Sequence, residues 1–186
     1  MAIILASASP RRKELLSLIT ADFIIKVSDA DEGSVKTPAP EETAKALAAI
    51  KGDAVSSLYP DDTVISADTI VVLGDRILGK PHGREEAYEM LSALSGKTHT
   101  VYTGVQVISE GTKTVFAEST SVTFYPLTDD EINGYIDTLE PFDKAGAYGI
   151  QGKGALLIKE IYGDYYNVMG LPVAKLARIM KEKHII

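Results

Sequence analysis

The spacing of hydrophobic and polar residues along the chain switches repeatedly between the period of a strand and the period of a helix. Short apolar runs bounded by polar residues or glycine predict strands at residues 2–6, 22–27, 63–73, 76–78, 98–109 and 113–127. A further strand before residue 166 follows a glycine-rich loop. A polar Ser-Ala-Asp-Thr sequence at 66–69 interrupts the apolar character of one long run, and Glu110-Gly111 predicts a hairpin.

Apolar residues spaced three and four apart predict helices at residues 10–20, 41–58, 84–96, 128–139 and 171–183. Ser9 and Thr128 precede two of these helices and are suited to cap them, and Pro10 suits a first helical position. We find no internal repeat, low-complexity linker or shift in composition. The alternation of strands and helices therefore predicts one α/β domain over residues 1–186, folded in two lobes.

Composition narrows the class of protein. Of the 186 residues, 45% are hydrophobic and 24% are charged, which is typical of a globular protein with a core of its own. The net charge of −7 argues against a protein that coats nucleic acid. The absence of cysteine excludes disulfides and thiolate metal sites and fits a reducing cytosol. Neither a signal peptide nor an apolar stretch of about 20 residues is found, so we expect a cytoplasmic protein without a membrane or nucleic-acid partner.

Several stretches resemble common functional motifs but lack residues that those motifs require. Residues 74–81 resemble a P-loop, but Pro81 stands where that motif needs a hydroxyl for magnesium. The glycines of residues 149–154 are in the wrong order for a dinucleotide-binding fingerprint. The histidines, at positions 82, 99 and 184, lack the spacing of metal ligands, so we expect them to be structural or on the surface. No G-x-S-x-G sequence supports a serine hydrolase.

The first predicted helix carries cations at the end where the helix dipole disfavours them. Arg11, Arg12 and Lys13 lie in its first turn, where partial positive charge gathers. They are either solvated surface charges or part of an anion site, formed with free backbone N–H groups and the hydroxyls of Ser7 and Ser9. Because the turn follows a strand, it lies where α/β proteins collect ligands, and it becomes a candidate phosphate site.

A carboxylate in the apolar run at 63–73 marks a second candidate site. Asp68 is unfavourable to bury unless it is paired or binds a cation. It is either a structural carboxylate bonded to backbone N–H groups, or a metal ligand or general base. Together with Glu32 it would suit magnesium, which prefers one or two carboxylates with water and phosphate. Lys51 and Lys80 would add positive charge for a polyphosphate.

The glycine-rich segment 140–154 is a third candidate. Its glycines, at 146, 149, 152 and 154, permit either a simple turn or a close approach of backbone to a ligand. Within this segment Gln151 offers a donor and an acceptor together, which complement the imide edge of uracil or thymine.

Taken together, these motifs resemble the Maf family of nucleoside triphosphate pyrophosphatases. The similarity extends almost from end to end, through LASASPRRKELL, SDADE, ADTIV, LGKP, LSGKTH and EPFDKAGAYGIQGKGALLIKEIYGDYYNVMGLP. The resemblance implies an elongated, two-lobed, mixed-sheet α/β fold similar to inosine-triphosphate pyrophosphatases, with the active cleft between the lobes. It also implies a cytosolic homodimer that hydrolyses dTTP and UTP to the monophosphate and pyrophosphate with a divalent cation, Mg²⁺ or Mn²⁺.

The resemblance also implies roles for individual residues. Asp68 is implied as the proton acceptor, with Glu32 as its partner on the metal and Asp31 as the alternative to Glu32. Lys51 and Lys80 are implied to contact phosphates. Ser7 and Arg12 are implied to line the phosphate site. Three further residues are implied to determine the choice of base: Arg11, Thr69 and Gln151. These last three match the subgroup that prefers dTTP and UTP rather than 7-methyl-GTP.

We therefore expect water, oriented or deprotonated by Asp68, to attack the α-phosphorus in line, while Lys51, Lys80 and Arg12 hold the pyrophosphate. Two alternatives stay open. Members of the family are associated with arrest of septum formation, so the protein could be a nucleotide-sensing regulatory binder of cell division. It could also be a pyrophosphatase for non-canonical purine nucleotides.

Overall fold

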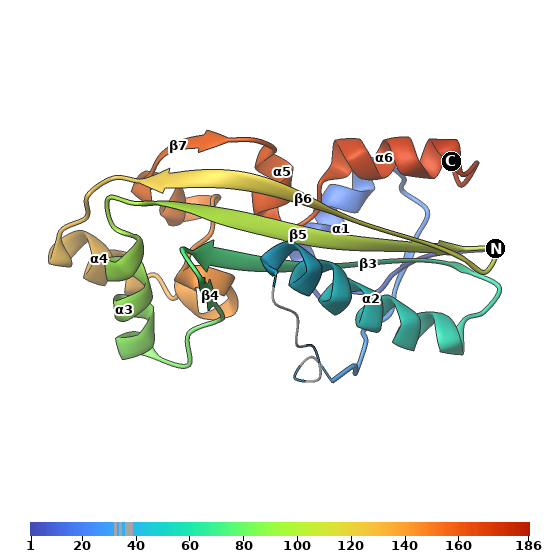
Figure 1. The fold of residues 1–186 in the computed structure, drawn as a ribbon, viewed down its shortest axis with the longest axis horizontal. Helices are drawn as coiled ribbons and strands as arrows, with labels where there is room; N and C mark the ends of the chain where they lie inside the picture. The colour runs from blue at the N-terminus through green and yellow to red at the C-terminus, as the bar shows by residue number, and fades with distance from the viewer. Residues whose placement is uncertain (32, 34, 36–38) are drawn as a thin grey trace. The chain divides into compact units, whose positions relative to one another are not determined.

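The fold is seen in a computed structural model, which describes residues 1–31, 33, 35 and 39–186. The chain divides into two compact units, whose elements can be followed by colour in Figure 1. Unit 1 comprises Met1–Asp68, Thr103–Glu118 and Gly170–Ile186. Unit 2 comprises Thr69–Tyr102 and Ser119–Met169.

The strands of the described residues form one mixed sheet in the order β2-β1-β3-β5-β6-β7, with β4 paired to β3. Strand β1 (Ile3–Leu5) is parallel to both β2 (Ile24–Ile25) and β3 (Thr63–Leu73). Antiparallel pairs join β4 (Arg76–Leu78) to β3, and β7 (Ile158–Tyr162) to β6 (Thr112–Phe124). Strand β5 (Thr98–Ser109) precedes β6, with Glu110-Gly111 between them as predicted. Strand β3 continues without a break through the polar residues 66–69.

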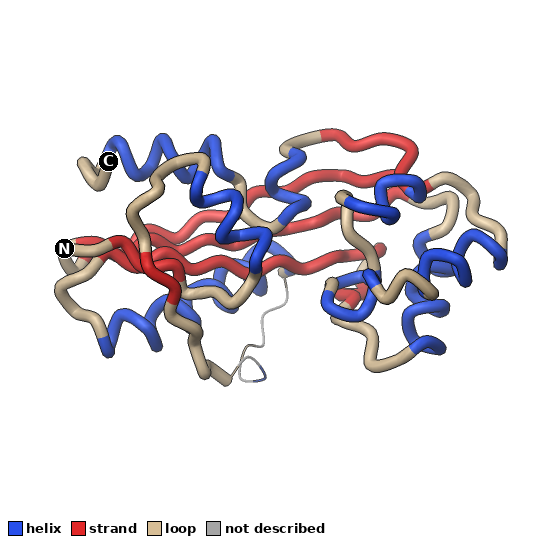
Figure 2. The backbone as a smooth tube through the Cα atoms, turned by 180° about the vertical axis from the view of Figure 1, so that it is seen from behind, coloured by secondary structure: helices blue, strands red, loops and turns tan. Residues whose placement is uncertain are grey.

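Unit 1 packs helices onto its strands from two sides. Helices α2 (Pro40–Leu58) and α6 (Val173–Glu182) lie on opposite sides of the strands, and α1 (Pro10–Ser17) follows β1 (Figure 1). Figure 2 shows the end of the chain just beyond the last turn of α6. One apolar cluster of this unit joins α2 to β1, β3 and β5 through Ile4, Ala6, Val55, Val64 and Ile108. Among the described residues, none of the helices combines the length and the apolar character that a membrane span requires.

Unit 2 has a core of its own. Helices α3 (Arg84–Leu94) and α4 (Asp129–Ile136) contribute Leu91, Leu94, Ile132 and Ile136 to it, together with residues from the strands and from the glycine-rich segment. Thr128 caps α4 as predicted, because its side chain accepts from the N–H of Glu131 while the Glu131 carboxylate accepts from the N–H of Thr128. The glycine-rich segment forms short 3₁₀ turns at Glu140–Asp143, Ala145–Ala147 and Gly152–Leu157.

One short helix of unit 2 was not predicted. Helix α5 (Tyr165–Met169) begins where the sequence analysis placed the end of a strand. The strand ends at Tyr162, and Gly163 turns the chain with a φ of 131°. Asp164 then accepts a hydrogen bond from the N–H of Tyr166 at 2.8 Å and starts the helix. Tyr165 and Tyr166 have the aromatic side chains that favour strands, so the sequence pattern did not indicate a helix starting there.

Candidate active site

The start of α1 gathers the hydroxyl and guanidinium groups that the sequence predicted there. The main chain just after β1 is fixed to the sheet, because the N–H of Ala6 donates to the carbonyl of Ile65 at 2.7 Å. The Ser9 hydroxyl caps the helix by accepting from the N–H of Arg12 at 3.4 Å. The buried Ser7 hydroxyl accepts from the N–H of Ser9 at 3.2 Å and from the Arg12 guanidinium at 3.3 Å.

Arg12 is held at a second point, where its Nε donates to the carbonyl of Gly170 at 2.8 Å. The guanidinium is therefore fixed between the loop after β1 and the residues that lead into α6. Arg11 is also half-buried, whereas Lys13 is exposed. The interpretation of these cations as solvated charges fits the exposed Lys13 and does not fit Arg12, whose guanidinium bonds to Ser7 and Gly170. A fixed guanidinium beside the N–H groups of a first helical turn can bind an anion.

Asp68 on β3 forms a direct ion pair with Lys51, which projects from α2. The two side chains are only 13% and 17% exposed. The attraction between the two opposite charges offsets part of the free-energy cost of removing each group from water. The structure thus gives Asp68 a lysine partner, which the sequence analysis did not predict. The two residues are 17 positions apart on different elements, and only the packing of α2 against β3 brings them together.

Helix α2 lies very close to the sheet beside Lys51. A Cβ at Gly52 would overlap the Gln106 side-chain oxygen and would lie 2.5 Å from the Ser66 hydroxyl. The buried Gln106 amide donates to Asp53 at 3.0 Å, and Ser66 donates to a main-chain carbonyl of α2 at 2.7 Å. These contacts lie on the two sides of Lys51 along the helix, and they fix the helix that carries it against the sheet.

Unit 2 carries the other predicted site residues. Thr69 and Gln151 are half-buried, and Lys80 is exposed. The carbonyl of Gly79 accepts from the N–H of Gly146 at 2.9 Å. The structure therefore joins the turn that carries Lys80 to the glycine-rich segment that leads to Gln151.

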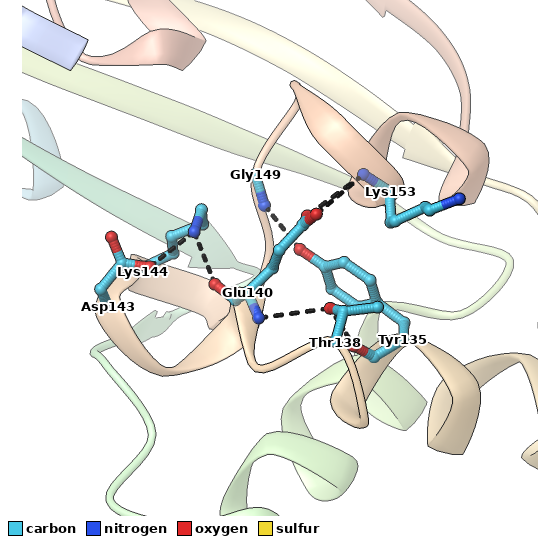
Figure 3. Close-up of polar contacts among 7 residues, drawn as sticks. All are labelled: Tyr135, Thr138, Glu140, Asp143, Lys144, Gly149 and Lys153. Atoms are coloured by element: carbon cyan, nitrogen blue, oxygen red, sulfur yellow. Dashed lines mark hydrogen bonds and ion pairs between the residues drawn. The ribbon is translucent and has the colours of Figure 1, made fainter. Parts of the chain in front are cut away.

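Two side chains that no sequence pattern indicated hold this glycine-rich segment. Glu140 accepts from the N–H of Lys153 at 3.1 and 3.2 Å, and the Tyr135 hydroxyl accepts from the N–H of Gly149 at 3.1 Å (Figure 3). The one available signal was a carboxylate at the start of a segment rich in glycine, whose backbone N–H groups need acceptors.

The carboxylates of the candidate site are the side chains that could bind a metal ion. Glu32 lies outside the described residues. Asp31 is exposed and accepts from the N–H of Gly33 at 3.0 Å. Within the described part of the chain, no group of three or more acidic or histidine side chains is arranged for a metal ion. The single carboxylate of Asp68 fits a cation that keeps water and substrate phosphate as most of its ligands, as magnesium does.

The histidines have other roles, as expected. His99 is buried in unit 2, with its Nε2 atom 2.7 Å from the Tyr148 hydroxyl and with edge-to-face contacts to the rings of Phe124 and Tyr148. Burial lowers the pKa of His99 to about 4, so the ring is neutral at pH 7. Burial also raises the pKa of Tyr148, so its hydroxyl keeps its proton. His82 and His184 are exposed.

Comparison with known proteins agrees with the resemblance. The family described as Maf-like protein matches residues 2–183. A dTTP/UTP pyrophosphatase of Bacillus velezensis is 52% identical over 183 residues, which cover 98% of this chain and 97% of the relative. A dTTP/UTP pyrophosphatase of Bacillus cereus is 52% identical over 180 residues, which cover 97% of this chain and 94% of the relative.

Solved structures with much lower identity share the fold. The Ham1 protein of Staphylococcus aureus has a TM-score of 0.58 at 15% identity, and a HAM1 protein of Coxiella burnetii has a TM-score of 0.52 at 14% identity. Each comparison covers 97% of this chain and 98% of the other. The expected α/β fold class with a mixed sheet is confirmed. With a family match over residues 2–183 and 52% identity to its relatives, the chain belongs to the Maf-like protein family.

Proposed function

We propose that this protein is a nucleoside triphosphate pyrophosphatase that hydrolyses UTP and dTTP to the nucleoside monophosphate and pyrophosphate. The observation that carries the proposal is the 52% identity, over nearly the full length of both chains, to relatives named dTTP/UTP pyrophosphatase. Two fixed charged groups in unit 1, Arg12 and the pair of Asp68 with Lys51, support it.

The start of α1 is the proposed phosphate site. Its first turn supplies backbone N–H groups and partial positive charge, and Ser7 and Arg12 supply a hydroxyl and a guanidinium. Because Arg12 is already bonded to Ser7 and Gly170, it loses little conformational freedom when a phosphate binds. We also assign a phosphate contact to Lys80.

Asp68 is the proposed proton acceptor. It takes the proton from water as the water oxygen bonds to the α-phosphorus, and the bond from that phosphorus to the bridging oxygen breaks to release pyrophosphate. Lys51 holds the carboxylate in position and provides positive charge for the phosphates. Asp68 and Glu32 are the residues that would hold a divalent cation, which would neutralise phosphate charge and polarise the attacked group.

Arg11, Thr69 and Gln151 are the residues proposed to select the base. The Gln151 amide presents one donor and one acceptor, as the imide edge of uracil and thymine requires. Cytosine carries a donor and an acceptor in the reverse order, so it would leave these groups unpaired, which weakens binding.

Pyrophosphate release from UTP, dTTP, CTP, ATP, GTP and ITP, each with Mg²⁺, Mn²⁺ or EDTA, tests the proposal. We expect the highest kcat/KM on UTP and dTTP, and loss of activity in EDTA that added Mg²⁺ or Mn²⁺ restores. Preference for ITP or another purine would favour the non-canonical purine alternative. The absence of release from every nucleotide would contradict the proposed activity.

A further inference from the structure

The turn that carries Gln151 is held at both ends by side chains that have no role in the scheme above. We propose that Glu140 is a positioning residue that fixes this turn, with Tyr135 as its second anchor, and that it thereby sets the preference for the base. This inference rests on the proposed function, because it takes Gln151 as a base-selecting residue.

Glu140 anchors the turn on the carboxyl side of Gln151. Its carboxylate accepts the N–H of Lys153 with both oxygens, at 3.1 and 3.2 Å. Figure 3 shows the ammonium end of Lys153 pointing away from this carboxylate, so the contact is to the main chain rather than an ion pair. A charged acceptor makes a stronger hydrogen bond to a backbone N–H than a neutral one does.

Tyr135 anchors the turn on the amino side. Its ring is buried in the core of unit 2, and its hydroxyl accepts the N–H of Gly149 at 3.1 Å. The two anchored N–H groups, of Gly149 and Lys153, therefore lie two residues before and two residues after Gln151. A five-residue turn fixed at both ends leaves its central residue few alternative positions.

Glu140 is itself held in place. Its N–H donates to the Thr138 hydroxyl at 3.2 Å, and its carbonyl accepts from Lys144 at 2.5 Å (Figure 3). The preceding residue, Leu139, has a φ of 64°, a left-handed conformation that is unfavourable for leucine. Such a conformation persists where the surrounding contacts impose it.

The turn is also shaped to receive the carboxylate. Gly152 has a φ of 64°, and a Cβ there would lie 2.8 and 3.0 Å from the two Glu140 oxygens. Only a residue without a side chain leaves room for Glu140 to reach the N–H of Lys153. The carboxylate and the turn therefore fit each other closely, next to the residue proposed to select the base.

The inference follows from how an amide selects a base. The donor and acceptor of Gln151 discriminate only if both are aimed at one edge of the base, so freedom of the turn weakens selection more than it weakens catalysis. We expect loss of the Glu140 anchor to raise KM for UTP and to leave kcat nearly unchanged.

The test compares Glu140→Ala with Asp164→Ala, which removes the acceptor for the first turn of α5 in the same unit. We expect Glu140→Ala to lower the ratio of kcat/KM for UTP to that for CTP by about tenfold, because cytosine carries the donor and acceptor in the reverse order. Asp164→Ala should lower Tm and leave that ratio unchanged. Equal ratios in wild type and Glu140→Ala would overturn the inference.

The variant Glu140→Gln tests whether the turn needs the hydrogen-bond acceptor of Glu140 or its negative charge. The amide keeps one oxygen that accepts the N–H of Lys153, so we expect it to restore most of the UTP preference and to slow hydrogen exchange of that N–H relative to Glu140→Ala. A Gln variant as poor as the Ala variant in both measurements would overturn the inference. A wild-type enzyme inactive on UTP and dTTP would instead contradict the proposed function, whereas the exchange rates report on the anchor without any turnover.

Discussion

Asp68 and Lys51 show how a residue suited to catalysis is kept inside a protein. A carboxylate with 13% of its side chain exposed needs a partner, and Lys51 provides one by direct contact. The same contact fixes where the carboxylate oxygens lie. One ion pair thus has a structural role and, in the proposed reaction, a chemical one.

Replacing Asp68 with Asn separates these two roles. The amide keeps the size of the side chain but is a very poor base, so we expect kcat on UTP to fall by roughly 100-fold or more. We expect the free energy of unfolding to fall by about 1–3 kcal/mol, since the variant leaves the Lys51 ammonium largely buried without its opposite charge. Steady-state kinetics and urea unfolding measure the two effects.

Asp53→Asn is the matched control for this variant. Asp53 lies on α2 and is also ion-paired, to Lys113 at 2.8 Å, but it has no part in the proposed chemistry. Its Asn variant keeps the oxygen that accepts from Gln106. Its Asn variant should keep kcat within about twofold of wild type, because the pair is on the surface. An Asp68→Asn enzyme as active as Asp53→Asn would refute the role of Asp68.

At the scale of elements, the separation between α2 and the sheet decides where Lys51 lies. Gly52 faces the Gln106 and Ser66 side chains with no room for a Cβ. A helix interior normally favours alanine over glycine. The glycine is therefore explained by the close approach of the helix to β3 and β5, and not by helix propensity.

Two glycine-to-alanine changes in helices should have opposite signs. Gly52→Ala must push α2 from the sheet, so we expect a loss of about 1–3 kcal/mol of stability and a lower kcat as Lys51 moves. Gly134→Ala, in α4, meets nothing within 4 Å and should raise stability by about 0.5–1 kcal/mol with kcat unchanged. Urea unfolding distinguishes these results. Equal stabilisation by both would show that α2 does not depend on this contact.

Much of the fold follows from the sequence because its signals are local. The cap at Thr128, the proline at the start of α1 and the alternation of apolar residues in β5 are each contained within a few neighbouring positions. The contact of Asp68 with Lys51 and that of Glu140 with the N–H of Lys153 are different in kind. They depend on how separate segments pack, which no short pattern specifies, so the sequence predicted the candidate residues but not these partners.

The stability of the whole chain should depend on pH through His99. Burial places its pKa in the folded state at about 4, below the ordinary value of 6.5 for histidine. The unfolded state therefore binds more protons between pH 6.5 and 4, and the free energy of unfolding falls as the pH falls through that window. The loss contributed by this group is complete near pH 4, at about 3 kcal/mol.

Urea unfolding at pH 7 and at pH 4.5, in wild type and in His99→Gln, measures this dependence. The variant loses packing at both pH values, but its stability should fall less between them, because its side chain does not titrate. The acidic residues and the exposed histidines are common to both proteins. Parallel losses in the two proteins would show that His99 does not carry the effect.

The bond from Arg12 to the carbonyl of Gly170 joins residues 158 positions apart. During translation, the arginine leaves the ribosome long before its acceptor has been made. A nascent chain that has completed β1 and α1 still lacks the carbonyl that fixes the guanidinium, so the proposed phosphate site is completed late in synthesis. If the proposed site binds phosphate, free nucleotide therefore has no finished site to occupy while most of this polypeptide is being made.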